Sequence, residues 1–419
     1  MPTAERVSQR PRTRARVPLL VLAAALASLA TCAPSAARAR RVNEPAVQQR
    51  PRRVGSEAAT TAARPSPVQP GTREEVDDGD VVRVDTQLVS VPVVVTDGAG
   101  RALTGLRAED FLLFEDGRPQ KIASFATTDA PFEVALLLDT SGSTREEMSL
   151  IRRAAFAFIK ALRPDDRVAV LAFNNGREGR ERVAVVEVKT PLTNDRDELQ
   201  AAVESIGASN GTPFYDGLEA VAREVFREKP REGASGRRAL VALTDGVDSA
   251  SESDFGTARA TLKRAGLVSY FIQVNTEDYV EEGLIQSCEG GGSLRLSRKQ
   301  LERYRRLVAP GTDAEEFADF CRMGPLERMH ANGALYDLAR REMEALARDS
   351  GGRNFPVADL REACGALRRV AEEIGTQYSL GYYPTNKARD GAYRNIRVQA
   401  RGVGDARVRA REGYRAPKG

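Results

Sequence analysis

A short apolar run that ends abruptly in a polar loop places the strongest constraint on the fold of this chain. Val134–Leu138 has the length of a strand buried on both faces, and the loop Asp139–Ser143 (DTSGS) follows it directly. Apolar residues then recur every three or four positions from Met148 to Leu162, which predicts an amphipathic helix. A buried strand followed by a helix is typical of a parallel sheet, whose ligand sites lie beyond the carboxyl ends of its strands.

The polar loop has two interpretations. The Asp139 carboxylate and the Ser141 and Ser143 hydroxyls are spaced by two residues, and they are hard oxygen ligands that suit a divalent cation such as Mg²⁺. Gly142 lets the loop turn tightly. Asp and Ser are also common turn residues, so the same loop could simply cap the helix that follows. The loop by itself leaves both interpretations open.

Strands and helices alternate over residues 131–375, with one interruption. We predict strands at 134–138, 168–173, 183–188, 239–243, 268–274 and 354–357, and helices at 148–162, 199–206, 213–226, 255–264, 335–348 and 360–374. Such alternation requires crossover connections, which produce a mostly parallel sheet with helices on both faces. The predicted fold class is therefore α/β, with a doubly wound sheet of Rossmann-like type.

Strand patterns without helices flank this α/β region. Residues 81–130 contain alternating valines and then a predicted hairpin between Phe111–Phe114 and Lys121–Phe125. Residues 376–416 contain three further strand patterns. Because either half alone is too small for a stable core, we predict that they form one all-β domain into which the α/β domain is inserted.

Residues 277–333 interrupt the alternation. They contain no strand pattern and only two helix-like pieces, near 298–307 and 314–322, so we interpret them as an insertion. The insertion follows the predicted strand 268–274, which places it on the same edge of the sheet as Asp139. Cys288 and Cys321 both lie in it and are the best candidates for a disulfide, whereas Cys364 falls on a predicted helix and is expected to be a buried thiol.

The amino terminus has the pattern of an export signal. Five arginines precede an apolar run from Val17 to Ala30, and Ala37-Arg38-Ala39 has the form of a signal-peptidase site, so residues 1–39 are predicted to be a signal peptide. The mature protein is then expected to be periplasmic, envelope-associated or secreted, with lipidation of Cys32 as a less favoured alternative. No later apolar stretch is long enough to span a membrane, and residues 40–80 are predicted to be a disordered linker.

Charge and histidine content exclude some classes of function. Residues 1–53 carry a net charge of +9, which leaves −5 for the rest of the chain, so the predicted folded part shows no sign of nucleic-acid binding. His330 is the one histidine among 419 residues, which disfavours zinc sites and acid–base catalysis by histidine.

Two further loops complete a motif. Thr212 begins one predicted helix and Asp245 ends a predicted strand, so both can converge on Asp139. The order Asp-x-Ser-x-Ser, a distant Thr and a distant Asp resembles the metal-ion-dependent adhesion site of von Willebrand factor type A domains, here Asp139, Ser141, Ser143, Thr212 and Asp245. The flanking strands resemble those of the bacterial VWFA-related proteins, so the resemblance covers residues 81–416 apart from the insertion.

The resemblance implies a binding protein. In that family many domains bind an acidic residue of a protein ligand through the metal, so the resemblance implies Mg²⁺ here, with Mn²⁺ or Ca²⁺ as alternatives. We therefore expect an exported, non-enzymatic protein that binds another protein or matrix in adhesion or cell-envelope assembly. One alternative is a structural envelope protein whose metal loop only stabilises the fold. A metal-dependent hydrolase or phosphotransferase is disfavoured, because Ser141 stands where the usual second acid would be.

Overall fold

The computed structural model describes residues 88–142, 147–179, 181–228, 237–288, 294–311 and 320–418. The predicted signal peptide 1–39, the predicted linker 40–80 and the candidate ligand Ser143 lie outside these residues. Within the described part of the chain, no helix is long and apolar enough to cross a membrane.

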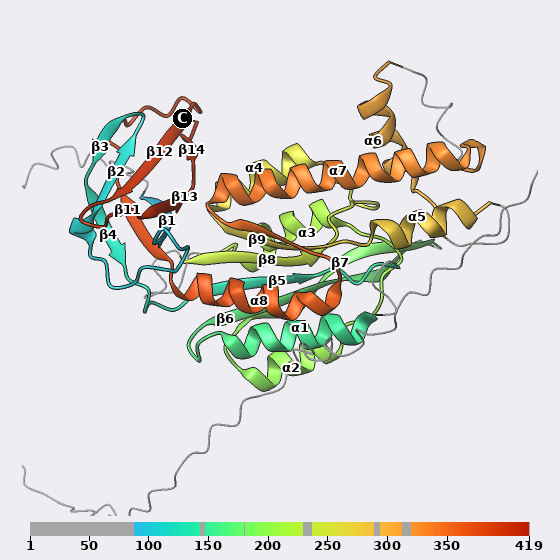
Figure 1. Ribbon diagram of the computed structural model, residues 1–419, viewed down its shortest axis with the longest axis horizontal. Coiled ribbons are helices and arrows are strands. Elements are labelled where there is room, and N and C mark those ends of the chain that lie inside the picture. The colour runs from blue at the N-terminus through green and yellow to red at the C-terminus, as the bar shows by residue number, and fades with distance from the viewer. Residues whose placement is uncertain are drawn as a thin grey trace, which may run out of the picture. The chain divides into compact units, whose positions relative to one another are not determined.

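A six-stranded sheet forms the centre of the α/β domain (Figure 1). Its strand order is β10-β9-β8-β5-β6-β7; the first five are parallel and β7 runs antiparallel to β6. The strands are β5 (Glu133–Leu138), β6 (Arg167–Glu178), β7 (Glu181–Thr193), β8 (Arg238–Thr244), β9 (Val268–Val274) and β10 (Arg353–Val357). The predicted fold class, an α/β domain with a mostly parallel sheet, is confirmed.

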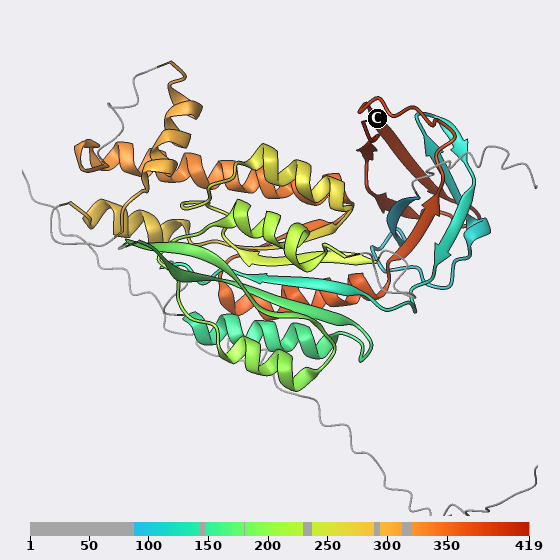
Figure 2. The same ribbon diagram turned by 180° about the vertical axis from the view of Figure 1, so that it is seen from behind.

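Helices cover both faces of this sheet, as Figures 1 and 2 show from opposite sides. One face packs against α1 (Met148–Ala161), α2 (Arg196–Glu204) and α8 (Leu360–Gly375). The other packs against α3 (Phe214–Ala220) with the π-helical turn Val221–Val225, α4 (Phe255–Ala265) and α7 (Pro325–Ser350). Alternate residues of β5 enter the two cores, Leu136 one and Leu137 the other, which explains why the strand is apolar from Val134 to Leu138.

The flanking segments form two antiparallel four-stranded sheets, with orders β13-β1-β11-β4 and β14-β12-β2-β3. Their strands are β1 (Val89–Thr96), β2 (Phe111–Glu115), β3 (Arg118–Gln120), β4 (Ile122–Ala126), β11 (Tyr378–Tyr382), β12 (Tyr393–Ala400), β13 (Arg407–Ala410) and β14 (Gly413–Arg415), and a 3₁₀ turn spans Ala108–Asp110. Each sheet combines strands from before and after the α/β domain, and one core holds side chains from both, among them Val91, Phe111, Tyr378 and Val398.

The hairpin predicted in the first flanking segment is wrong in its second strand. β2 pairs with β3 across a two-residue turn in which Asp116 and Gly117 have φ angles of 47° and 78°. Such a turn pairs β2 with the residues that follow immediately. The predicted partner Lys121–Phe125 largely coincides with β4, which pairs with β11 in the other sheet.

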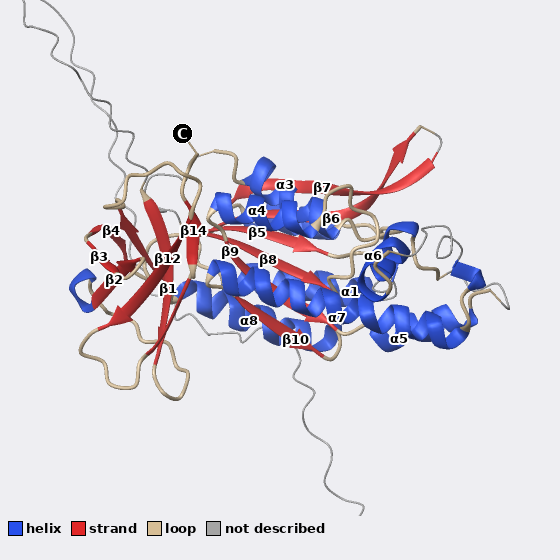
Figure 3. Ribbon diagram, turned by 90° about the horizontal axis from the view of Figure 1, so that it is seen from above, coloured by secondary structure: helices blue, strands red, loops and turns tan. Residues whose placement is uncertain are grey.

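The predicted insertion 277–333 contains α5 (Glu277–Gln286), α6 (Arg298–Val308) and a 3₁₀ turn (Phe320–Arg322), and it ends within α7. α5 and α6 lie beyond the carboxyl ends of the central strands (Figure 3). The helix predicted at 335–348 begins ten residues earlier, at Pro325, a residue suited to the first turn of a helix. The insertion therefore continues directly into a helix that covers the sheet.

The insertion has an apolar core of its own. Side chains from α5, α6, the 3₁₀ turn and α7 meet there, and Val247 from the loop after β8 packs against them. The predicted Cys288–Cys321 disulfide is present. Cys364 lies on α8 as predicted, but it is partly rather than fully buried.

Candidate functional site

The candidate ligands lie at the carboxyl ends of two neighbouring parallel strands. Leu138 of β5 stands opposite Leu243 of β8, and the Asp139 backbone N–H donates a hydrogen bond of 2.9 Å to the Leu243 carbonyl oxygen. This register brings Asp139 and Asp245 to the same edge of the sheet. The described candidates, Asp139, Ser141, Thr212 and Asp245, are between 2% and 5% exposed.

The Asp139 carboxylate is fixed by one hydrogen bond from its own loop and one from the neighbouring strand β8. Its Oδ1 accepts from the Ser141 backbone N–H at 3.0 Å, and its Oδ2 accepts from the Thr244 hydroxyl at 2.6 Å. Burial, and then the negative charge of Asp245, raise the pKa of Asp139 to about 7 despite these hydrogen bonds. The two carboxylates therefore repel each other across a water-poor site.

The Asp245 carboxylate is held by residues that the motif did not include. Its Oδ1 accepts from the Val247 backbone N–H at 2.9 Å, and its Oδ2 accepts from the Thr276 hydroxyl at 2.7 Å. The Tyr336 hydroxyl of α7 lies 2.7 Å from the Thr276 hydroxyl. Thr276 follows β9 at the same edge of the sheet, a position that the strand pattern could have revealed, whereas nothing in the sequence indicates Tyr336.

Backbone hydrogen bonds join the Thr212 loop to the loops after β5 and β8. Ser209 donates from its backbone N–H to the Thr140 carbonyl oxygen at 2.7 Å. The Thr212 backbone N–H donates to the Ser249 hydroxyl at 2.9 Å, and the Ser249 N–H donates to the Thr212 carbonyl oxygen at 3.0 Å. The structure thus brings together four of the five predicted ligands on three connected loops.

The donor set fits a hard divalent cation. Carboxylate and hydroxyl oxygens are ligands that Mg²⁺ and Ca²⁺ prefer. A cation between Asp139 and Asp245 would offset the repulsion that raises the pKa of Asp139. Among the described residues, no group of three or more His, Cys, Asp and Glu side chains is placed to hold a metal, so this set depends on its hydroxyls.

Comparison with known families identifies this part of the chain. Residues 133–296 match the family model of the von Willebrand factor type A domain. The chain contains a von Willebrand factor type A domain. The predicted relationship to this family is confirmed, and VWA domains in general mediate protein–protein interaction or adhesion.

Individual similar proteins are distant. An uncharacterized protein of Synechocystis sp. is 25% identical over 187 residues, which cover 42% of this chain and 41% of that protein, so the chain spans less than half of the relative's length. A von Willebrand factor type A protein from Catenulispora acidiphila has a TM-score of 0.37 and 12% identity, over 80% of this chain and 74% of that one. BatB from Bacteroides thetaiotaomicron has a TM-score of 0.32 and 20% identity, over 58% and 97%.

The raised pKa of Asp139 predicts that the metal-free protein loses stability as the pH rises from about 4 to 7. In this range the folded protein holds a proton on Asp139 that the unfolded chain has released, so rising pH favours unfolding. We expect the free energy of unfolding in a chelator to fall by about 4 kcal/mol across this range because of this group. Urea unfolding at several pH values measures this free energy. The Asp139→Asn variant should lose most of this dependence on pH, and a dependence equal to that of the wild type would contradict the prediction.

Proposed function

We propose that this is an exported protein that binds a protein or matrix ligand through a divalent metal ion, in adhesion or cell-envelope assembly. The ligands would be Asp139, Ser141, Ser143, Thr212 and Asp245, with Mg²⁺ as the favoured metal and Mn²⁺ or Ca²⁺ as alternatives. The observation that carries the proposal is the convergence of two buried carboxylates on connected loops at the carboxyl edge of a VWA sheet. The Cys288–Cys321 disulfide supports export, because disulfides persist in oxidising compartments.

The donor set favours capture of an acidic group. Two carboxylates and three hydroxyls supply a net charge of −2, which only neutralises a divalent cation and leaves it attractive to a further anion. A carboxylate from a partner protein would complete the coordination. We further propose that the protein is not an enzyme, since a binding role needs no catalytic base or nucleophile.

Selection from a peptide library tests this function and does not require the partner to be identified. The purified protein is used to select random peptides from a displayed library in Mg²⁺, and bound peptides are released with EDTA. We expect the released peptides to be enriched in Asp and Glu and to bind at least about 10-fold more weakly when the acid is replaced by its amide. Selection without such enrichment would overturn the proposal.

A structural role for the metal is the second candidate. All four described candidate ligands are almost fully buried, which suits an ion that stabilises the fold without meeting a partner. In that case Mg²⁺ would raise the melting temperature, but no peptide would be released specifically by EDTA.

A further inference from the structure

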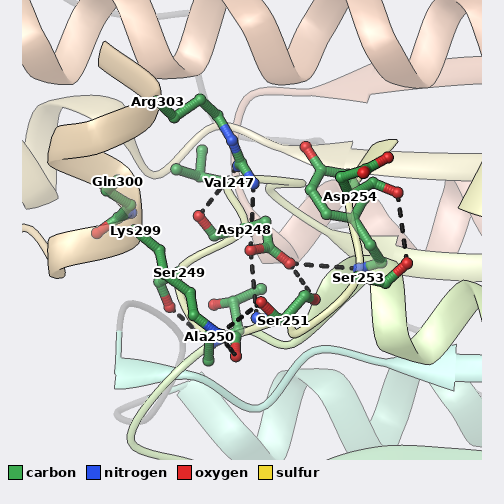
Figure 4. Close-up of polar contacts among 12 residues, drawn as sticks. Val247, Asp248, Ser249, Ala250, Ser251, Ser253, Asp254, Lys299, Gln300 and Arg303 are labelled. Atoms are coloured by element: carbon green, nitrogen blue, oxygen red, sulfur yellow. Dashed lines mark hydrogen bonds and ion pairs between the residues drawn. The ribbon is translucent and has the colours of Figure 1, made fainter. Parts of the chain in front are cut away.

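The loop after β8 carries a buried carboxylate that belongs to no candidate ligand set. Asp248 is 1% exposed, and burial raises its pKa. Its carboxylate accepts hydrogen bonds of 3.3 Å from the backbone N–H groups of Tyr215 and Ser251. Arg303 of α6 lies 3.5 Å from one carboxylate oxygen and stacks over the Tyr215 ring at 4.8 Å. The positive charge of Arg303, which belongs to the insertion, therefore compensates the buried negative charge of Asp248 (Figure 4).

The same helix binds four successive backbone carbonyl groups of this loop. Arg303 donates to the oxygen of Asp248 at 3.4 Å, and the Ser297 hydroxyl, which caps α6, donates to that of Ser249 at 2.8 Å. The Lys299 ammonium donates to the oxygens of Ala250 and Ser251 at 3.3 and 2.7 Å (Figure 4). We call residues 248–251 the clamped loop. These four carbonyl groups accept hydrogen bonds from side chains of α6 and its N-cap, not from the backbone N–H groups of a strand or helix.

The clamped loop in turn holds Thr212. Ser249 exchanges two hydrogen bonds with it, one through the Ser249 hydroxyl and one through the Ser249 backbone N–H. A Cβ atom added to Gly211 would lie 3.3 Å from the Cβ of Ala250, so the two loops also pack closely. A continuous series of contacts therefore leads from α6 through the clamped loop to a candidate metal ligand.

We propose that α6 of the insertion positions Thr212 for metal binding, with Arg303 and Lys299 as positioning residues that act through the clamped loop. The proposal rests on the proposed function, since it concerns the same metal site. It assigns the insertion a role in the site itself. Groups that orient metal ligands from outside the coordination shell commonly change metal affinity by 10- to 100-fold.

The experiment compares Mg²⁺ affinity and local hydrogen exchange in variants of the purified full chain. Lys299→Met removes the ammonium from a side chain that is 41% exposed and leaves no buried charge without its partner. Arg303→Met removes the partner of Asp248, and Arg303→Lys restores the charge without the planar guanidinium. Arg306→Met, an exposed position on the same helix, is the matched control.

We expect Lys299→Met to bind Mg²⁺ about 5- to 10-fold more weakly in calorimetric titration, and Arg303→Met more weakly still. Arg303→Lys should recover part of the loss, and Arg306→Met should match the wild type. In the metal-free protein, the amides of residues 209–216 should exchange faster in Lys299→Met and Arg303→Met than in the wild type. The exchange rates of peptides from β5 and α1 should not change. A general loss of stability would instead raise exchange throughout the domain.

The outcomes separate the two proposals. If the wild type binds no Mg²⁺, the proposed function fails, and exchange at residues 209–216 still reports whether α6 positions the loop. If the wild type binds Mg²⁺ and Lys299→Met binds it equally well with unchanged exchange, the role of α6 is refuted. Should Arg303→Met fail to fold, Lys299→Met and Arg303→Lys decide the result.

Discussion

Mg²⁺ binding is expected to weaken at least about 100-fold when Asp139 is replaced by Asn. The substitution keeps the size of the side chain but removes one of the two charges that would hold the cation, in a buried site where a charge interacts strongly. Isothermal titration with Mg²⁺ and Mn²⁺ measures the affinity. The melting temperature with and without the metal gives a second measurement, because a ligand that binds only the folded state stabilises it.

Two variants act as controls for this result. Asp337→Asn removes an exposed carboxylate of α7 and should leave the affinity unchanged. Asp245→Asn removes the other buried carboxylate and should reproduce the loss. The metal-free Asp139→Asn protein should be folded, and at pH 8 at least as stable as the metal-free wild type, because it lacks the repulsion that raises the pKa of Asp139. Undiminished Mg²⁺ binding by Asp139→Asn would show that the metal is held elsewhere.

Arg237→Ala is expected to lower the free energy of unfolding by about 3–5 kcal/mol. Arg237 is 2% exposed and lies immediately before β8, where its guanidinium donates to the carbonyl oxygens of Thr127, Ala130 and Ile374. Thr127 and Ala130 lie on the segment between β4 and β5, and Ile374 lies in the last turn of α8, just before the chain returns to the β domain. Removing the guanidinium takes one donor from each of these carbonyl groups and creates a cavity beside Phe132, over which it stacks at 4.6 Å.

Denaturant unfolding measures this loss of stability. One further variant separates its two causes, and a second is a control. Arg237→Met fills most of the cavity but donates no hydrogen bond, so the remaining destabilisation reports on the carbonyl groups. Arg361→Ala, at an exposed position of α8, should change stability by less than about 0.5 kcal/mol. Equal stabilities of Arg237→Ala and the wild type would mean that the junction does not depend on this side chain.

Local patterns in the sequence account for the central fold. The apolar run Val134–Leu138 predicted a strand buried on both faces, and β5 is such a strand. Residues that cap helices and form turns act on neighbours a few positions away, so they can be interpreted without a structure. The longer α7 follows from the same kind of signal, because Pro325 marks a helix start that the hydrophobic pattern alone did not show.

The candidate site was predicted only in part. Asp139 and Asp245 follow predicted strands, so the sequence predicted that they lie at one edge of the sheet. Thr276, which donates to Asp245, follows a predicted strand, but Tyr336, whose hydroxyl contacts that of Thr276, comes from a distant segment whose approach depends on the packing of α7 against the sheet. The hairpin error has a related cause, since the alternating pattern of Ile122–Ala126 identifies a strand but not its partner.

The sequence by itself determined most strands and helices of the α/β domain, the order of the candidate ligands and the interruption after β9, but not α5, β3 or the start of α7, because periodicity and turn chemistry report only on near neighbours. Only the tertiary structure decided what supports the ligands. Arg303 is 55 residues from Asp248, and Arg237 is 137 residues from Ile374. The burial that makes such contacts strong exists only after the chain has folded, since in the unfolded chain water surrounds the same groups.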